Sequence, residues 1–155
     1  MPAQQNETLN VVEVVKLALD IFNEPFIHFM SDEEELIAKM DRTQLIRVIT
    51  NLVKNAIQAV PEVLNPKIVV SVSSEESMAK ISVADNGKGI DQEFRDKIFE
   101  PKFTTKSSGM GLGLGMVKTI VETYGGSISF TSQPGKGAVF TIRIPKVKSR
   151  KSAVS

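Results

Sequence analysis

The sequence predicts an α/β domain in which helices pack on one face of a mostly antiparallel sheet. Segments with apolar residues at helical spacing are interspersed with segments in which apolar and polar residues alternate. Two pairs of these alternating segments are joined by short turns, which predicts antiparallel hairpins. The chain has 155 residues, 41% hydrophobic and 24% charged, which is enough for one domain with its own core.

The first quarter of the chain is expected to contain one helix and two short strands. Residues 10–22 carry apolar side chains at helical spacing, and Pro25 ends this helix. Residues 26–30 and 36–40 are short apolar segments typical of strands. We expect the acidic stretch SDEEE between them to form their turn.

The middle of the chain is expected to form a long helix followed by a hairpin. Residues 41–60 have the most regular helical pattern, with Asp41 as N-cap and Pro61 after the end. Residues 67–74 and 78–85 alternate apolar and polar side chains, with a short turn between them.

The last part of the chain is expected to return from helix to hairpin. Residues 91–99 suit a short helix or turn, whereas residues 104–110 show no periodic pattern. A helix then follows until the Gly-Gly pair that starts at Gly125. Residues 126–133 and 137–145 are expected to be strands joined by the turn PGKG.

Composition excludes several classes of protein. The chain has no cysteine, which excludes disulfides and thiolate metal sites, and its one histidine, His28, excludes a two-histidine zinc site. The net charge of +1 argues against a nucleic-acid-binding protein. No apolar run is long enough to span a membrane, and the N-terminus lacks signal-peptide features. We therefore expect a cytoplasmic chain, which is compatible with a membrane-anchored parent protein.

The long helix carries polar residues on a second face. Arg47, Asn51, Asn55 and Gln58 share that face, and asparagine is a poor helix former. The face is either solvated or forms the polar side of a binding site. Amide oxygens there could coordinate Mg²⁺ without adding negative charge near phosphates.

Two glycine-containing segments add further candidates. In DNGKGI, Asp85 follows a strand that we expect to be buried, so its carboxylate needs a donor. It either caps its own turn or accepts from an exocyclic amine such as that of adenine. In GMGLGLG, residues 109–115, the alternation with apolar residues disfavours a linker and the glycine content disfavours a strand. The interpretation left for this segment is a glycine turn at the start of a helix, where backbone N–H groups can bind a phosphate.

Four motifs in order, NLVKNAIQA, DNGKGI, FEPKFTTK and GMGLGLG, resemble the N, G1, F and G2 boxes of the histidine-kinase ATP-binding domain. That domain shares a superfamily with gyrase, Hsp90 and MutL. The resemblance spans about residues 10–145. The motifs NLVKNAIQA and FEPKFTTK look most like those of the nitrogen-regulation type of sensor kinase. It implies the Bergerat fold, a two-layer α/β sandwich with a mixed sheet against three helices and a mobile ATP lid.

The resemblance implies a role for each matching residue. Asn55 is expected to ligate Mg²⁺, and Asp85 to accept a hydrogen bond from adenine N6. Asn51 is expected to line the phosphates and Lys106 to approach the terminal phosphate, which makes these two the expected catalytic residues. The other expected nucleotide-binding residues are Gly87, Gly89, Gly109, Gly111, Gly113 and Leu114, and the expected lid anchors are Phe99 and Phe103. The sequence departs from the family pattern at Lys102, Met110 and Ala138.

A phosphoacceptor histidine motif is absent from the sequence. His28 lies in a strand-like segment, where we expect a core or edge residue. The resemblance therefore implies the catalytic half of a two-component protein-histidine kinase, with ATP and Mg²⁺ as cofactors. Its expected partners are the dimerisation and phosphoacceptor domain of the parent kinase and a response regulator. We expect the isolated domain to be monomeric and the parent homodimeric.

The expected domain organisation has three parts. Residues 1–9 would lead in from a missing helical hairpin, residues 10–145 would form the ATP-binding domain, and residues 146–155 would be a basic flexible tail.

Two alternatives to the kinase remain. One is a degenerate nucleotide-binding or interaction module without phosphotransfer, which the intact motifs argue against. The other is a self-sufficient ATPase. Gyrase- and Hsp90-type ATPases place a glutamate base where this chain has Asn51, and an amide cannot take a proton.

Overall fold

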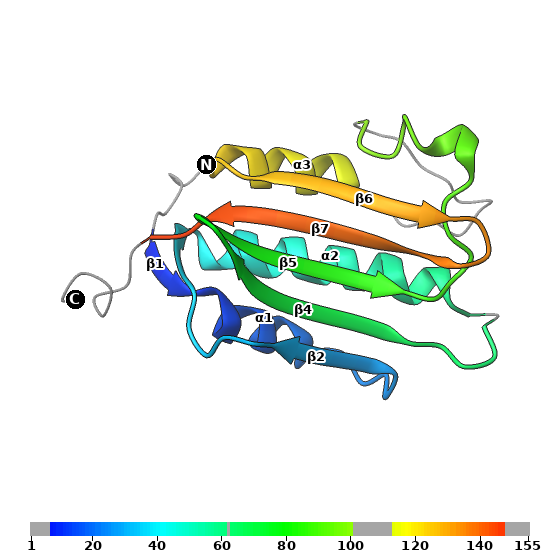
Figure 1. The fold of residues 1–155 in the computed structure, drawn as a ribbon, viewed down its shortest axis with the longest axis horizontal. Helices are drawn as coiled ribbons and strands as arrows, with labels where there is room; N and C mark the ends of the chain where they lie inside the picture. Colours follow the sequence, from blue (N-terminus) through cyan, green and yellow to red (C-terminus); the bar gives the residue numbers. More distant parts are fainter. Residues whose placement is uncertain (1–6, 62, 101–112, 148–155) are drawn as a thin grey trace.

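The computed structural model describes residues 7–61, 63–100 and 113–147, and its helices all cover one face of the larger sheet (Figure 1). The elements in chain order are β1 (Glu7–Asn10), α1 (Val11–Leu19), β2 (Ile27–Ser31), β3 (Ile37–Met40), α2 (Arg42–Ala59), β4 (Ile68–Glu75), β5 (Met78–Asp85), the short 3₁₀ helix η1 (Gln92–Phe94), α3 (Leu114–Thr123), β6 (Ser127–Gln133) and β7 (Gly137–Pro145).

The larger sheet has the order β2-β4-β5-β7-β6. Strand β2 runs parallel to β4, and every other neighbouring pair is antiparallel. The two predicted hairpins, β4–β5 and β6–β7, are both present. The structure thus confirms the predicted two-layer α/β sandwich with a mixed, mostly antiparallel sheet against three α-helices.

The core lies between the helices and the inward face of this sheet. On β5 every second residue, at Ala79, Ile81 and Val83, is buried, as the alternating sequence predicts. The apolar stripe of α2 packs against this face, and its buried members are Leu45, Val48, Ile49, Leu52, Val53 and Ala56. Helix α2 is therefore held along its length, with its remaining faces free to carry polar groups.

The expected turn between β2 and β3 is wrong as a hairpin connection, because the two strands lie in different sheets. Strand β2 pairs with β4, whereas β3 pairs with β1. The sequence gives no sign of β1, since its four residues, ETLN, contain one buried side chain, that of Leu9. His28 lies exposed on β2, an edge strand, in agreement with one of its two predicted locations.

Residues just outside both expected domain boundaries make contacts with the rest of the fold. Residues 7–9, assigned to the lead-in segment, belong to β1, and Glu7 Oε1 accepts a hydrogen bond of 3.0 Å from the backbone N–H of Arg42 at the start of α2. At the other end, Ala38 forms an isolated bridge with Lys146, and Val147 N–H donates to the Ile37 carbonyl. The rest of the expected tail, residues 148–155, lies outside the described residues.

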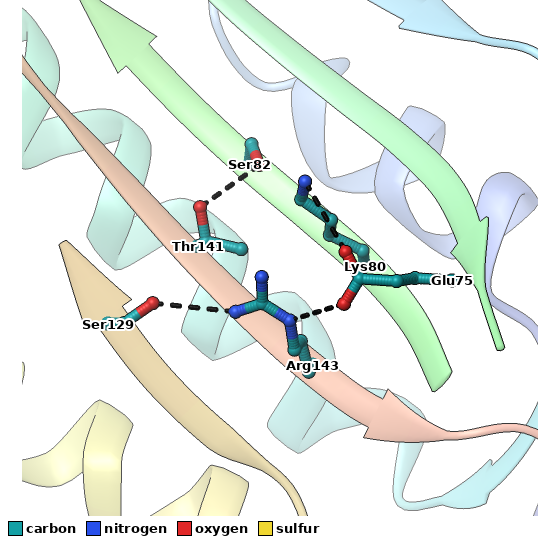
Figure 2. A network of polar contacts seen from close by, with 6 residues as sticks. All are labelled: Glu75, Lys80, Ser82, Ser129, Thr141 and Arg143. Carbon is teal, nitrogen blue, oxygen red and sulfur yellow. Dashed lines mark hydrogen bonds and ion pairs between the residues drawn. The ribbon is translucent and has the colours of Figure 1, made fainter. Parts of the chain in front are cut away.

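The outward face of the sheet carries a network of polar side chains (Figure 2). Arg143 donates to Glu75 at 2.7 Å, and Lys80 lies 3.7 Å from the other carboxylate oxygen. On the same face the hydroxyls of Ser82 and Thr141 lie 3.2 Å apart. An antiparallel sheet commonly leaves one such face to water. This arrangement places the candidate site on the opposite, helix-covered face.

Candidate nucleotide-binding site

The polar face of α2 brings two asparagines together. Asn51 and Asn55 are one turn apart, and Asn55 Nδ2 donates to Asn51 Oδ1 at 3.2 Å. Asn55 is only 4% exposed, although it is polar. The bond uses the amide nitrogen of Asn55, and its amide oxygen is the atom chemically suited to a cation. The asparagine pair on α2 thus offers an amide oxygen of the kind that the predicted magnesium site would use as a ligand.

The start of α3 lies against this pair. Gly113 is the N-cap of α3 and has a left-handed φ of 96°. A Cβ at Gly113 would lie 2.3 Å from Asn51 Nδ2 and would displace the Asn51 amide, and the left-handed φ itself favours glycine. The prediction that the glycine-rich segment leads into a helix start is confirmed at Gly113, with Leu114 buried as the first helical residue. A helix N-terminus beside two amides is a favourable environment for an anion.

Asp85 ends strand β5 on the helix-covered face. Its Oδ1 accepts a hydrogen bond of 2.9 Å from the Gly87 N–H. Burial raises the pKa of the Asp85 carboxyl, and hydrogen bonds from the backbone N–H groups of Gly87 and Ala138 act in the opposite direction. Asp85 therefore does cap its own turn. The capping bond does not prevent Asp85 from also accepting a hydrogen bond from an exocyclic amine, because a carboxylate has several lone pairs.

The turn after Asp85 is packed between two other elements. A Cβ at Gly87 would lie 2.1 Å from the Ala59 carbonyl oxygen at the end of α2. A Cβ at Gly89, where φ is 75°, would lie 2.5 Å from the Gln133 carbonyl oxygen at the end of β6. Because these contacts are with backbone atoms, both Gly87 and Gly89 are needed for the turn to fit between the ends of α2 and β6.

A narrow recess lies between α2, this turn and β7. Its lining residues are Asn55, Ala56, Ala59, Asp85, Gly89, Ile90, Ala138 and Phe140. Its free volume is about 10 Å³, so a flat ring enters only if its walls separate. Apolar sides with one carboxylate acceptor suit a heteroaromatic ring that carries an amine. The recess and the asparagine pair share Asn55, as one site for a base and its phosphates requires.

Phe99, the first expected lid anchor, packs beside the recess. Its ring lies edge-on to Phe130 at 5.8 Å and to Phe140 at 6.5 Å between centroids. The other expected lid residues, which are Lys102, Phe103, Lys106, Gly109, Met110 and Gly111, lie outside the described residues.

Sequence reasoning missed two residues that contact the site's surroundings. The Ser132 hydroxyl accepts from the Ile90 N–H at 2.8 Å, and the Ser132 carbonyl accepts from Arg95 Nη1 at 2.8 Å. A signal was available for Ser132. In the alternating segment SISFTSQ it occupies the inward position that Ile128 and Phe130 fill earlier in the strand. A hydroxyl at an inward position predicts a hydrogen-bond partner.

Comparison with protein families matches residues 40–148 to the family described as histidine kinase-, DNA gyrase B-, and HSP90-like ATPase. The chain is 49% identical over 113 residues to sensor histidine kinase ZraS of Escherichia coli (strain K12), covering 72% of this chain and 23% of that protein. It is 41% identical over 113 residues to sporulation kinase D of Bacillus subtilis (strain 168), covering 73% and 22%. The chain thus spans about a quarter of the length of these relatives.

Solved structures give the same result. The catalytic domain of histidine kinase ThkA superposes with a TM-score of 0.81 at 35% identity, covering 92% of this chain and 96% of that one. ThkA in complex with the response regulator protein TrrA superposes with a TM-score of 0.77 at 32% identity, covering 93% and 42%. Within the described ranges, no helix is both long enough and apolar enough to cross a membrane.

Proposed function

Since the chain belongs to the family of histidine kinase-, DNA gyrase B- and HSP90-like ATPases, as the catalytic domain of a histidine kinase, we propose that it binds Mg-ATP and delivers the γ-phosphate to a histidine on another domain. The observation that carries this proposal is that Asn55 belongs to both the asparagine pair and the recess. Its side chain contacts Asn51 beside the start of α3 and also lines the recess that contains Asp85.

In this proposal each residue of the site contacts a different part of Mg-ATP. Asp85 accepts from the adenine amine, while the apolar sides of the recess exclude water from the ring. The Asn55 amide oxygen ligates Mg²⁺, and Asn51 with the N-terminus of α3 lies against the phosphates. When bound, Mg-ATP supplies the phosphoryl group that is transferred. Lys106 is proposed to neutralise charge on the terminal phosphate.

The chemistry of Asn51 favours transfer to a partner over hydrolysis. An amide cannot accept a proton from water, so Asn51 cannot serve as general base. The imidazole of a partner histidine is itself a nucleophile and needs no such base. We therefore propose slow hydrolysis in the isolated chain and transfer when a phosphoacceptor domain is present.

We also propose two partners. One is the dimerisation and phosphoacceptor domain of a longer parent kinase, which would be a homodimer. The other is a response regulator, the class of protein seen in complex with ThkA. The nitrogen-regulation subtype stays a prediction that rests on the motifs NLVKNAIQA and FEPKFTTK, since the relatives compared above carry other names.

The test is calorimetric titration of the chain with ADP, with and without Mg²⁺. Saturable binding that Mg²⁺ strengthens and Asp85→Asn removes is the expected result. Adding a phosphoacceptor domain from a histidine kinase, with radiolabelled ATP, then tests transfer to histidine. Absence of ADP binding up to millimolar concentration would favour an interaction module without nucleotide chemistry.

A further inference from the structure

The turn that forms one side of the recess is held by contacts from both of its neighbours. On the α2 side, Lys88 N–H donates to the Ala59 carbonyl at 3.1 Å. On the side of the β6–β7 hairpin, Gly135 N–H donates to the Lys88 carbonyl at 2.7 Å. Both bonds join backbone groups and involve no side chain.

Ser132 adds a side-chain link between the same turn and hairpin. Its hydroxyl accepts from the Ile90 N–H at 2.8 Å and lies 3.2 Å from the Gly137 carbonyl, to which it donates. One hydroxyl thus connects the residue whose side chain lines the recess with the residue at the start of β7. Both of its partners are backbone groups at the border of the base recess.

The two partners of Ser132 each lie next to a group that meets the base in the proposed function. Ile90 lines the recess directly, and Gly137 precedes Ala138, whose N–H helps to hold the Asp85 carboxylate. A Cβ at Gly137 would lie 2.0 Å from the Asp85 carbonyl oxygen, so this part of β7 and the end of β5 are in close contact. The Ser132 hydroxyl therefore fixes the Ile90 side of the recess relative to Asp85, the hydrogen-bond acceptor in the recess.

The backbone of Ser132 is itself held in place. Its carbonyl accepts from Arg95 Nη1 at 2.8 Å, and the Arg95 guanidinium lies 5.2 Å from the centre of the Phe130 ring. Ser132 is thus linked to Arg95, the residue after η1, on one side and to the turn on the other. A residue with both backbone and hydroxyl constrained can hold its partners at a defined separation.

We propose that Ser132 is a positioning residue for recognition of the adenine base. It does not touch the base. It sets the separation between Ile90 and the Asp85–Ala138 pair, and so determines how well the recess distinguishes adenine from guanine. The proposal rests on the proposed function, because it assumes that the recess takes the base of a nucleotide.

The first experiment measures ADP and GDP affinities for the wild type, Ser132→Ala, Ser132→Thr and Ser129→Ala. Ser129 is on the same strand but on the outward face, near Arg143, so it controls for loss of a β6 hydroxyl. We expect Ser132→Ala to weaken ADP binding about tenfold, because the released turn would have to be ordered again when the base binds, at about the cost of one part-buried hydrogen bond. GDP binding should change far less, and Ser132→Thr should recover most of the ADP affinity.

Equal loss of ADP and GDP affinity in Ser132→Ala, or no loss of either, would overturn the proposal. An equal fall in both would indicate a general structural role, which the thermal unfolding midpoint of each variant would also register. Failure of the wild type to bind ADP would count against the proposed function instead.

A second measurement tests the link without any nucleotide. Amide hydrogen exchange at Ile90 reports the bond to Ser132 directly. We expect the Ile90 N–H to exchange at least about tenfold faster in Ser132→Ala than in the wild type or in Ser129→Ala. Unchanged exchange at Ile90 would show that the hydroxyl does not hold the turn, whatever the nucleotide data show.

Discussion

The side-chain amide of Asn55 donates to that of Asn51 across one turn of α2, with 3.2 Å between Nδ2 and Oδ1. The bond orders two groups that would otherwise have rotamer freedom, in a position where Asn55 is buried. It makes the two residues one unit, so that a change in either is expected to affect both.

Asn55→Asp is expected to abolish Mg-dependent ADP binding. The substitution replaces the donating nitrogen with an oxygen, so two acceptors face each other, and it buries a negative charge near the phosphates. Calorimetric titration measures the loss. Gln58→Glu is the matched control, since it makes the same amide-to-carboxylate change at an exposed position of α2. Equal loss in both variants would mean that charge alone, and not the position of Asn55, explains the effect.

Asn51→Glu is expected to raise the rate at which water attacks ATP, because it supplies the base that the site lacks. Steady-state phosphate release measures this rate. Asn51→Gln, which has the same length without a carboxylate, is the control, since Gly113 leaves little room beside residue 51. No difference between the two variants would contradict the account of Asn51 as the reason for slow hydrolysis.

Asp85→Asn is expected to reduce ADP affinity by at least about a hundredfold, because a carboxylate acceptor becomes an amide. In the wild type, lowering the pH should weaken ADP binding through a window that begins above the ordinary pKa of 3.8, since burial raises the pKa of this carboxyl. Calorimetry across that window tests it, and pH-independent affinity would argue against an ionised Asp85 as acceptor.

The stability of the nucleotide-free protein should follow the opposite trend. A carboxyl with a raised pKa binds its proton more tightly in the folded state. Its contribution is therefore fully present below the unfolded pKa and is lost as pH rises through the folded pKa. The free energy of unfolding of the wild type, taken relative to Asp85→Asn in urea titrations, should fall as pH rises through that window. A rise instead would reverse the assigned shift.

Gly113→Ala is expected to weaken ADP binding at least about tenfold more than Gly125→Ala. Both glycines have positive φ, so both substitutions should cost about 1–2 kcal/mol of stability. A Cβ at Gly125 would make only an ordinary contact of 3.5 Å with Pro145, whereas one at Gly113 would displace the Asn51 amide. Urea unfolding and ADP titration of the two variants separate backbone strain from loss of the site.

Glu76→Asn is expected to stabilise the protein by about 1 kcal/mol. Glu76, in the β4–β5 turn, has a φ of 54°, which asparagine tolerates better than glutamate. Urea unfolding measures the change. Glu76→Gln removes the same charge without relieving the backbone, so a gain of equal size in that variant would assign the effect to charge.

The sequence predicts the site better where spacing along one element determines it. The spacing of Asn51 and Asn55 on a helix implies their contact, and alternation predicts which residues of β5 face inward. Contacts between distant segments are harder to foresee. Strand β2 pairs in parallel with β4 while β3 pairs with β1, and β1 is too short and polar to be recognised in the sequence. Ser132 gave a signal, but its partner Ile90 is 42 residues away.

The position of β7 in the sheet has a consequence for how the protein is made. It follows the other strands in sequence, yet it lies between β5 and β6, and β6 has no other strand partner in the described part of the chain. Strand β6 can therefore join the sheet only after β7, and the base recess needs Ala138 and Phe140 from β7. During synthesis, a chain that ends before β7 has the asparagines of α2 but no completed recess. Nucleotide binding would thus mark the chains in which this strand has been inserted, and the long-range pairing makes that insertion a late step of folding.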